Sequence, residues 1–344
     1  MTAATRADAT MLDVDGLKVA LDADTGLVKA IDGLSLSIRR GETFALVGES
    51  GCGKSMTALA LMRLLPENGG VTHGSVALEG QDVLALPESR MRAVRGGKIG
   101  MIFQEPATSL NPVMRVGDQI VEAIEAHTAL RGAAARAKAI QWLGKVGIPE
   151  PERRIDEYPF RLSGGQKQRV MIAMTLAAEP DFLIADEPTT ALDVTIQAQI
   201  IELMTELQKR TGSAIIMITH DLGVVADIAD KVLVMYAGKP VEYGVKDDVY
   251  YRPLHPYTWG LLDSLPRHDL NEKTALCPIQ GQPPSLINVP SGCAFHPRCP
   301  YATSKCRSEV PALRDIGGEH FAACHYAGDP GFERGVIECA GVGA

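Results

Sequence analysis

The stretch GESGCGKSM, residues 48–56, decides how the rest of the sequence is interpreted. It matches the pattern G-x-x-x-x-G-K-S/T, in which successive backbone N–H groups surround a phosphate and the lysine contacts the outer phosphates. The apolar run at residues 44–47 predicts a buried strand before it, and residues 54–65 predict a helix whose N-terminus faces the phosphates. The stretch therefore predicts binding of a nucleoside triphosphate, and the alternative is a glycine-rich turn without a ligand.

The residues that this pattern assigns to the phosphates lie in the loop and in the first turn of the helix. The hydroxyl of Ser55 is also expected to bind Mg²⁺, and position 52 needs only a small side chain. The predicted phosphate-binding residues are Gly48, Ser50, Gly51, Cys52, Gly53, Lys54, Ser55 and Met56.

The overall composition is that of an ordinary globular protein. The chain has 344 residues, of which 46% are hydrophobic and 22% charged, so it is long enough for one large domain and a smaller one. Its formal net charge of −8 argues against broad electrostatic binding to nucleic acid. No apolar run approaches the roughly 18 residues that span a bilayer, and residues 1–16 lack the pattern of a secretory signal. We therefore expect the chain to stay in the cytosol.

Apolar runs and helical periodicity predict a mostly parallel sheet that is covered by helices. The predicted strands lie at residues 34–38, 75–80, 182–186 and 214–219, and the predicted helices at 131–146 and 194–210. Beyond residue 250 the sequence is rich in proline and cysteine and weakly periodic. We therefore predict two domains, a nucleotide-binding domain at residues 1–250 and a loop-rich module at residues 251–344.

Two carboxylates, Asp186 and Glu187, stand at the carboxyl end of the apolar run at residues 182–186. Ligands of open α/β sheets bind outside this edge of the sheet. A carboxylate at the strand end suits Mg²⁺, and a second one suits a general base that activates water. We therefore predict that Asp186 is a magnesium ligand and that Glu187 is the catalytic base.

A third motif, LSGGQKQR at residues 162–169, lies between the glycine loop and the two carboxylates. Together the three motifs resemble the ATP-binding cassette (ABC) family, and the resemblance covers nearly the whole chain. It implies an α/β P-loop ATPase fold with an antiparallel β subdomain and a helical subdomain, and it implies ATP as the nucleotide. It also assigns Gln104 to a loop that senses Mg²⁺ and couples to membrane subunits, Asp193 to a dimer-contact loop, and His220 to the γ-phosphate.

The signature residues Ser163, Gly164, Gly165 and Gln166 have a physical reason for their positions. The serine can cap the helix that follows, and the two glycines let its backbone approach a phosphate closely. In the family, the signature of one subunit closes over the ATP that the P-loop of another subunit holds. The resemblance therefore implies that hydrolysis requires a dimer and that these residues contact the ATP of the partner.

Residues 19–33 depart from the family pattern because they contain no aromatic residue that could stack on adenine. Stacking of this kind contributes ~1 to 3 kcal/mol on the scale of aromatic–base contacts. Leu27 or Val28 is expected to supply an apolar contact instead, and the prediction of phosphate binding is unaffected.

Three classes of ABC protein compete for this sequence: transporter ATPases, cassettes that act on DNA, and translation factors that act on the ribosome. Cassettes of DNA repair and chromosome structure insert a long coiled coil before the signature, but the segment between Ser55 and Ser163 has no sustained heptads. Translation factors carry two cassettes, whereas this chain has one. We therefore predict a transporter ATPase that works with separate membrane subunits and does not bind nucleic acid.

Four further stretches resemble the importers of dipeptides, oligopeptides and nickel. They are EPATSLNPV at residues 105–113, HPYTWGLLDSLPR at 255–267, QGQPPSL at 280–286 and GCAFHPRCP at 292–300. The resemblance implies two membrane permease subunits, an extracytoplasmic solute-binding protein and a second ATPase chain that is related but different. It places the chain at the cytoplasmic face of the inner membrane. Peptides are the first expectation for the cargo, while nickel chelates and other small solutes stay open.

Four cysteines near the end of the sequence, Cys293, Cys299, Cys306 and Cys324, have the spacing C-x5-C-x6-C-x17-C. Four thiolates are enough to bind a zinc ion or an iron–sulfur cluster. None of these gaps is typical of a zinc ribbon, and the resemblance to importers with this C-terminal segment implies a 4Fe–4S cluster. Zinc, free thiols and disulfide bonds are the alternatives.

The other cysteines, Cys52, Cys277 and Cys339, are expected to be structural, and His296 and His325 lie beside the set of four. A loop-rich segment of this size does not promise a large core of its own, and small modules of that kind often depend on a bound metal. The cluster is therefore expected to fold the module, and a redox role is the alternative.

Overall fold

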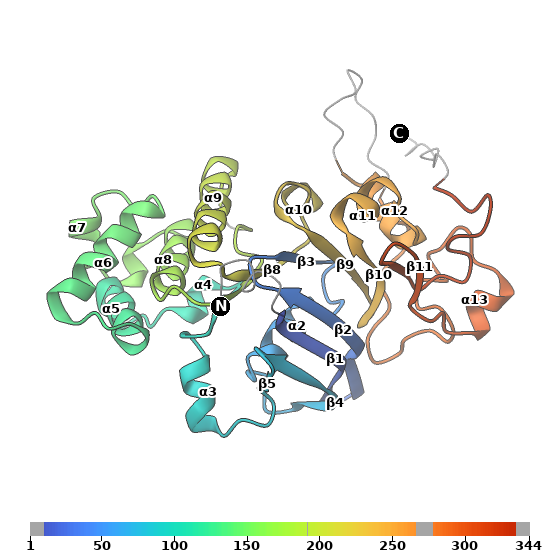
Figure 1. Cartoon of the computed structure of the whole chain (residues 1–344), viewed down its shortest axis with the longest axis horizontal. Coiled ribbons are helices and arrows are strands. Elements are labelled where there is room, and N and C mark those ends of the chain that lie inside the picture. Colours follow the sequence, from blue (N-terminus) through green and yellow to red (C-terminus); the bar gives the residue numbers. More distant parts are fainter. Residues whose placement is uncertain (1–9, 191, 266–277, 335–344) are drawn as a thin grey trace, which may run out of the picture. The chain divides into compact units, whose positions relative to one another are not determined.

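The computed structural model describes residues 10–190, 192–265 and 278–334 (Figure 1). Cys277 and Cys339 lie outside the described residues. The chain forms two compact units, and each is assembled from segments that are distant in the sequence. We call them the signature unit (Met1–Asp13, Ser37–Thr43 and Val76–Ile218) and the P-loop unit (Val14–Leu36, Phe44–Ser75 and Thr219–Ala344). The predicted domain boundary near residue 250 stays a prediction.

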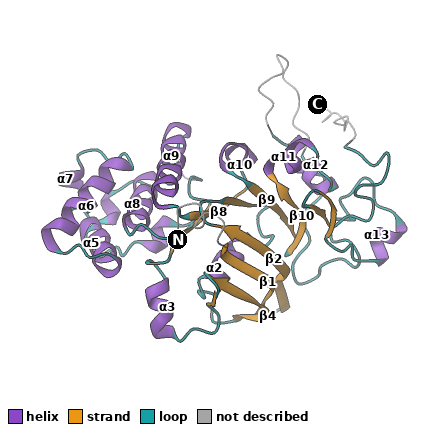
Figure 2. Ribbon diagram, in the orientation of Figure 1, coloured by secondary structure: helices purple, strands orange, loops and turns teal. Residues whose placement is uncertain are grey.

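A four-stranded sheet is built by the first two long strands and by two later ones, in the order β2-β1-β4-β5 (Figure 2). The strands are β1 (Thr10–Ala23), β2 (Gly26–Arg39), β4 (Gly69–Leu78) and β5 (Gln81–Asp82). In β2, Leu34, Leu36 and Ile38 are buried and alternate with more exposed residues, as the sequence predicts for a strand with one apolar face. Strands β2 and β4 begin several residues earlier than predicted.

Three parallel strands form the centre of the signature unit, in the order β8-β7-β6. They are β6 (Ile99–Ile102), β7 (Phe182–Asp186) and β8 (Ala214–Thr219), and every residue in them is buried. Strands buried on both faces form from continuous apolar runs, which is why β7 and β8 have the bounds that the sequence predicts. Helix α9 (Val194–Thr211) connects β7 to β8 and confirms the predicted helix in this region.

Three helices of the signature unit pack against one another and form its helical part (Figure 1). They are α5 (Val116–His127), α6 (Gly132–Lys145) and α8 (Gly164–Ala177). The buried side chains of α6 include Trp142 and Leu143, which follow the helical periodicity of the sequence. Shorter helices complete the unit: α3 (Glu88–Val94), α4 (Pro106–Ser109), α7 (Pro151–Arg154) and the 3-10 helix η1 (Pro159–Arg161).

In the P-loop unit, strand β3 (Thr43–Val47) pairs in parallel with β9 (Lys231–Tyr236). Helix α2 (Lys54–Leu61) follows the glycine loop and ends before the predicted residue 65, because Arg63 has the left-handed backbone conformation, with a φ of 52°. The other helices of the unit are α10 (Leu222–Ile228), α11 (Lys246–Tyr251), α12 (Pro256–Asp263) and α13 (Ser304–Ser308).

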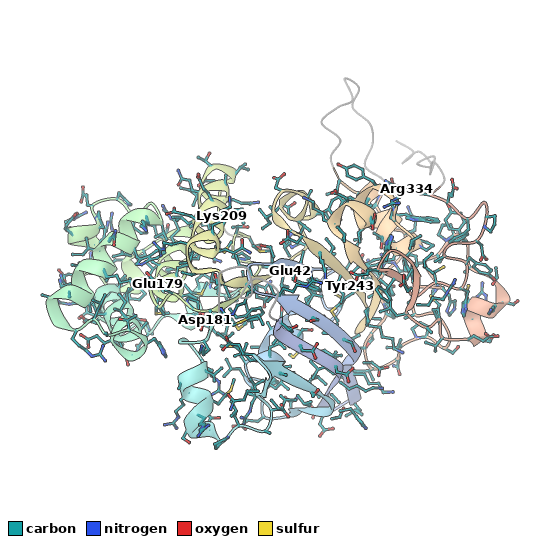
Figure 3. All side chains as sticks on the ribbon, in the orientation of Figure 1. Glu42, Glu179, Asp181, Lys209, Tyr243 and Arg334 are labelled. Atoms are coloured by element: carbon teal, nitrogen blue, oxygen red, sulfur yellow. The ribbon has the colours of Figure 1, made fainter. Side chains whose placement is uncertain are left out.

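Antiparallel strands extend the sheet of the P-loop unit, and the sequence did not predict them. They are β10 (Lys239–Val245), β12 (His320–Ala322) and β11 (Arg314–Gly317), in the order β9-β10-β12-β11. The ring of Tyr243 (Figure 3) contacts Phe321 on the neighbouring strand and Phe44 on β3, with ring centroids 5.7 and 5.9 Å apart. These contacts join the C-terminal residues to the strand that precedes the glycine loop.

A fully buried carboxylate, that of Glu242 on β10, fixes the segment that follows the sheet. Its oxygens accept hydrogen bonds from the backbone N–H groups of Leu254 (2.8 Å) and His255 (2.9 Å) and lie 2.8 Å from Nε2 of His320. Burial lowers the pKa of His255 to about 3, so this ring is neutral and its Nδ1 accepts the N–H of Tyr257 at the start of α12. The loop-rich segment is therefore held by specific polar contacts as well as by apolar packing.

Within the described residues, no helix is both long enough and apolar enough to cross a bilayer.

Candidate active site

Two glycines of the loop pack so closely against neighbouring backbone that no other residue fits. A Cβ atom at Gly48 would lie 2.4 Å from the carbonyl oxygen of Met235, and one at Gly53 would lie 2.3 Å from that of Ala30. Both have positive φ, 152° and 108°, which glycine adopts without strain. Gly51 has a φ of 78°, but a Cβ atom added there would have no neighbour within 4 Å. The loop is thus anchored at its two ends and open at its middle, as a phosphate cradle requires.

Lys54 is the first residue of α2 and is only 5% exposed. Its Nζ donates hydrogen bonds to the carbonyl oxygens of Gly48 (2.7 Å) and Glu49 (3.0 Å). The cation therefore lies folded across the loop, close to the N–H groups of the helix start. Gly53, the residue before the helix, has no side chain that could cap those N–H groups.

Cys52 fills the space beneath the loop, as predicted for a position that needs only a small side chain. It is 5% exposed, its Sγ lies 3.9 Å from Nζ of Lys54, and burial raises the pKa of its thiol. The uncharged thiol therefore packs within the loop.

The second group of predicted residues lies in the signature unit, at the carboxyl end of β7. Asp186 ends the strand and is 3% exposed, and Glu187 follows it with a φ of 47°, which is uncommon outside glycine. The N–H of Glu187 donates to the carbonyl oxygen of Ile218 (2.8 Å). This bond ties the left-handed residue to the neighbouring strand β8. Backbone strain of this kind is often found at active sites.

The carboxylate of Glu187 is oriented by two side chains. Gln104 donates to it from Nε2 (3.2 Å), and Thr190 donates from its hydroxyl (3.0 Å). The structure therefore brings together the residue predicted as the base and the glutamine predicted to sense Mg²⁺. Sequence analysis did not predict Thr190, which lies three residues after the glutamate.

The signature motif starts helix α8 through a reciprocal pair of hydrogen bonds. The hydroxyl of Ser163 accepts the N–H of Gln166 (3.3 Å), and the side chain of Gln166 accepts the N–H of Ser163 (3.0 Å). The predicted cap is confirmed, and this motif also fixes the side chain of the glutamine. A Cβ atom at Gly164 would meet nothing within 4 Å, so the start of the helix is open.

One buried residue joins helix α8 to the segment that follows Glu187. Gln168 is 1% exposed, and its Nε2 donates to the carbonyl oxygen of Pro188 (2.7 Å), directly after Glu187. Asp193 caps α9 by accepting the N–H of Ile196 (3.1 Å). The predicted dimer-contact residue therefore also has a local structural role.

His220, the predicted contact for the γ-phosphate, follows β8 directly and is exposed. The next residue, Asp221, caps helix α10 by accepting the N–H groups of Gly223 (2.9 Å) and Val224 (3.4 Å). The cap fixes the turn between strand and helix in which the histidine stands.

The four C-terminal cysteines lie together in the P-loop unit and line one small cavity. Aromatic rings enclose the cavity, and those that line it are Phe295, Tyr301, Tyr326 and Phe332. The backbone N–H of Cys293 donates to the carbonyl oxygen of Cys306 (2.8 Å), and a Cβ atom at Gly292 would lie 2.4 Å from that same oxygen. Residues 292–324, which carry the four cysteines and are called the cysteine loop, are therefore closed by backbone packing, although the cysteines are far apart in the sequence.

Burial and the proximity of the other thiols raise the pKa values of three cysteines at this cavity. Burial raises the pKa of Cys299 to about 12, and it also raises the pKa values of Cys293 and Cys324. All five described cysteines are free of disulfide bonds, so the disulfide alternative has no support. The structure therefore brings the four cysteines to one cavity.

The structure does not confirm that this set binds a metal. Among residues 10–190, 192–265 and 278–334, no group of three or more His, Cys, Asp or Glu residues is placed to hold a metal ion. Neither the zinc alternative nor the predicted cluster, which both need cysteines around one metal centre, therefore has support from the described residues. The four cysteines do line one cavity.

Most of the chain is similar to known proteins. Residues 31–190 match the family model described as "ABC transporter", and residues 241–306 match "Oligopeptide/dipeptide transporter, C-terminal region". The dipeptide transport ATP-binding protein DppD of Bacillus subtilis is 50% identical over 315 residues, which cover 91% of this chain and 94% of that protein. The oligopeptide transport ATP-binding protein OppD of Escherichia coli is 50% identical over 319 residues, 93% of this chain and 94% of that protein.

A solved structure with the same fold is a dimeric ATP-binding cassette in a post-hydrolysis state, bound to ADP and Pi. It has a TM-score of 0.63 and 26% identity, and the match covers 69% of this chain and 99% of that one. The fold and the family match define an ATPase of the ABC class. Within that class, the chain belongs to the family of ATP-binding subunits of dipeptide and oligopeptide transporters.

The geometry of the loop predicts the effect of removing its cation. Replacing Lys54 with Ala should raise the Kd for ATP about 10- to 100-fold, because hydrogen bonds to charged groups contribute about 1.5 to 3 kcal/mol. Isothermal titration of the purified chain with ATP measures this change. Lys209→Ala, at the exposed end of α9 (Figure 3), is the matched control and should leave the Kd unchanged. Equal affinities for the Lys54 variant and the unaltered chain would contradict this role.

Proposed function

We propose that this chain binds and hydrolyses ATP to power the import of peptides through separate membrane subunits. The observation that carries the proposal is the combination, in one chain, of the ABC motifs with a C-terminal segment that matches peptide transporters. Relatives at 50% identity over nine-tenths of the chain support peptides as the cargo rather than DNA or the ribosome.

Different residues bind the phosphates of ATP and its Mg²⁺ ion. Backbone N–H groups of the loop and of the first turn of α2 cradle the phosphates, and Lys54 leaves the loop carbonyls to contact the outer ones. Ser55, Gln104 and Asp186 would hold Mg²⁺, whose charge would offset that of the phosphates.

Hydrolysis itself requires a base close to the attacking water. Glu187 takes the proton of the water, and the bonds from Gln104 and Thr190 hold its carboxylate in a single orientation until ATP arrives. His220, in the turn between β8 and α10, contacts the γ-phosphate and stabilises the charge that develops there.

The signature acts on the ATP of a second cassette. The capping box orients the helix start of α8, and Gly164 leaves space in front of it, so its N–H groups can approach a phosphate held by another chain. We propose that the second cassette is a related but different chain. Two membrane permease subunits complete the complex at the cytoplasmic face of the inner membrane, and an extracytoplasmic solute-binding protein delivers the peptide.

The catalytic assignment predicts that Glu187→Gln binds ATP but hydrolyses it about 10²- to 10⁴-fold more slowly in the assembled transporter. The amide keeps the shape of the side chain and loses the base. Phosphate release measures turnover, and ATP titration shows that binding is retained. Near-normal turnover would refute the assignment. Glu206→Ala, an exposed change on α9, is the control and should hydrolyse ATP at the normal rate.

If the signature of this chain and the P-loop of the partner form one ATP site, a bulky residue in the signature should block hydrolysis there. In a complex whose P-loop is disabled by Lys54→Ala, the remaining activity should come from the partner's P-loop and this chain's signature. Adding Gly164→Trp should then abolish that activity, because the indole occupies the space that a phosphate needs. Ala137→Trp on the exposed face of α6 controls for bulk alone. Activity that survives the Gly164 change would contradict the composite site.

We also propose that Cys293, Cys299, Cys306 and Cys324 hold a 4Fe–4S cluster. The support is the donor set: four free thiols around one aromatic-lined cavity in a segment with little regular secondary structure. Such a cluster would supply covalent cross-links to the loops that carry the cysteines. The chain's own residues already order the site through the backbone bond between Cys293 and Cys306 and the close packing at Gly292.

Anaerobic purification followed by iron and sulfide analysis tests the cluster. We expect about four irons per chain, lost when Cys299 is replaced by Ser and retained when Cys52 is replaced by Ser. Cys52 is the matched control because it lies in the glycine loop, away from the cavity. Zinc in equal amount to the chain, with no iron, would refute the cluster.

A further inference from the structure

Residues from the C-terminal part of the chain hold Glu49, the second residue of the glycine loop, through both its backbone and its side chain. The N–H of Glu49 donates to the hydroxyl oxygen of Tyr257 on α12 (2.8 Å). Its carboxylate forms two parallel hydrogen bonds with Arg298, from Nη1 to Oε2 (2.5 Å) and from Nη2 to Oε1 (2.9 Å). All of these residues belong to the P-loop unit.

Arg298 is an unusually well-fixed side chain. It is 4% exposed, and each of its five N–H groups has an acceptor. Besides Glu49, the acceptors are the carbonyl oxygens of Ile279 (3.3 Å) and Gln280 (3.0 Å) and the hydroxyl of Tyr236 (3.4 Å). The guanidinium also lies over the rings of Tyr236 and Phe295, at 5.9 and 6.0 Å. Because all of these contacts hold the guanidinium of Arg298, its bidentate pair fixes the position of the Glu49 carboxylate.

The charge of Glu49 creates a problem for a loop that takes a triphosphate. A carboxylate on the loop that binds phosphates would repel them, and the repulsion is larger where water is partly excluded. Arg298 cancels this charge. It also fixes the residue whose carbonyl oxygen accepts the hydrogen bond from Nζ of Lys54 (3.0 Å), so the position of Glu49 influences that of the phosphate-binding lysine.

We propose that Arg298 is a positioning residue for ATP binding: it anchors and neutralises Glu49 so that the glycine loop accepts the phosphates. The inference rests on the proposed function in one respect, namely that ATP occupies this loop. Arg298 contacts Glu49 of the loop, and it acts through that residue.

A double-mutant cycle on the full-length chain, with ATP as the titrant, tests this role. Arg298→Ala should raise the Kd for ATP about tenfold or more, because it leaves a partly buried carboxylate without its partner. Glu49→Gln alone should change the Kd less than about threefold. The double variant Arg298→Ala/Glu49→Gln should recover most of the lost affinity, because the repelling charge is then absent.

The recovery separates this role from a merely structural one. If Arg298 only stabilised the C-terminal segment, removing the charge of Glu49 would not restore ATP binding, and such a result would overturn the proposal. Arg298→Lys keeps the charge but not the five-donor fork, and it should bind ATP with an affinity between those of the unaltered chain and the alanine variant. Arg307→Ala, an exposed change in the same segment, is the matched control and should leave the Kd unchanged.

The outcomes also separate this inference from the proposed function. An unaltered chain that fails to bind ATP would overturn both. An unaltered chain that binds ATP, together with an Arg298→Ala variant of equal affinity and normal thermal unfolding, would overturn this inference alone.

Discussion

The close packing of the glycine loop against the backbone beneath it is the constraint on which the site depends. Gly48 and Gly53 approach the carbonyl oxygens of Met235 and Ala30 at distances that exclude any Cβ atom. Those carbonyls belong to β9 and β2, so both strands must be in place before the loop has its shape. Because the loop is fixed at these two points, its N–H groups are preorganised, and ATP binding need not reshape it.

A second constraint concerns charge. A loop built for phosphates here contains a carboxylate, and the structure offsets it with a buried, fully hydrogen-bonded guanidinium from 249 residues further along the chain. Arg298 stands between Cys293 and Cys299, so the order of the cysteine loop and the position of Glu49 are linked by a single residue. In the signature unit, Gln168 links the signature helix to the segment after Glu187 in a comparable way, through one buried side chain.

The sequence predicted the parts of the structure that depend on local pattern. Strands β7 and β8 have the expected bounds because they are uninterrupted apolar runs, and Ser163 caps its helix because the capping motif is local. Strand β10 was missed because Pro240 and Gly244 interrupt its pattern, and β11 and β12 were missed because they are short and β12 pairs with a segment distant in the sequence. The pair between Arg298 and Glu49 could not be predicted for the same reason, although both residues lie in motifs that the sequence made visible. The closeness of the four cysteines was predictable from their number and spacing, but their binding of a cluster remains a prediction.

The central claim is that ATP hydrolysis by this chain drives peptide import, and a reconstituted complex tests it most directly. The chain would be purified with the membrane subunits that accompany it, placed in lipid vesicles, and supplied with the solute-binding protein on one side and ATP on the other. We predict that the rate of ATP hydrolysis rises when the binding protein is loaded with a di- or oligopeptide, and that labelled peptide accumulates across the membrane only while ATP is present. ATP hydrolysis that does not respond to any peptide, together with no peptide movement, would contradict the account.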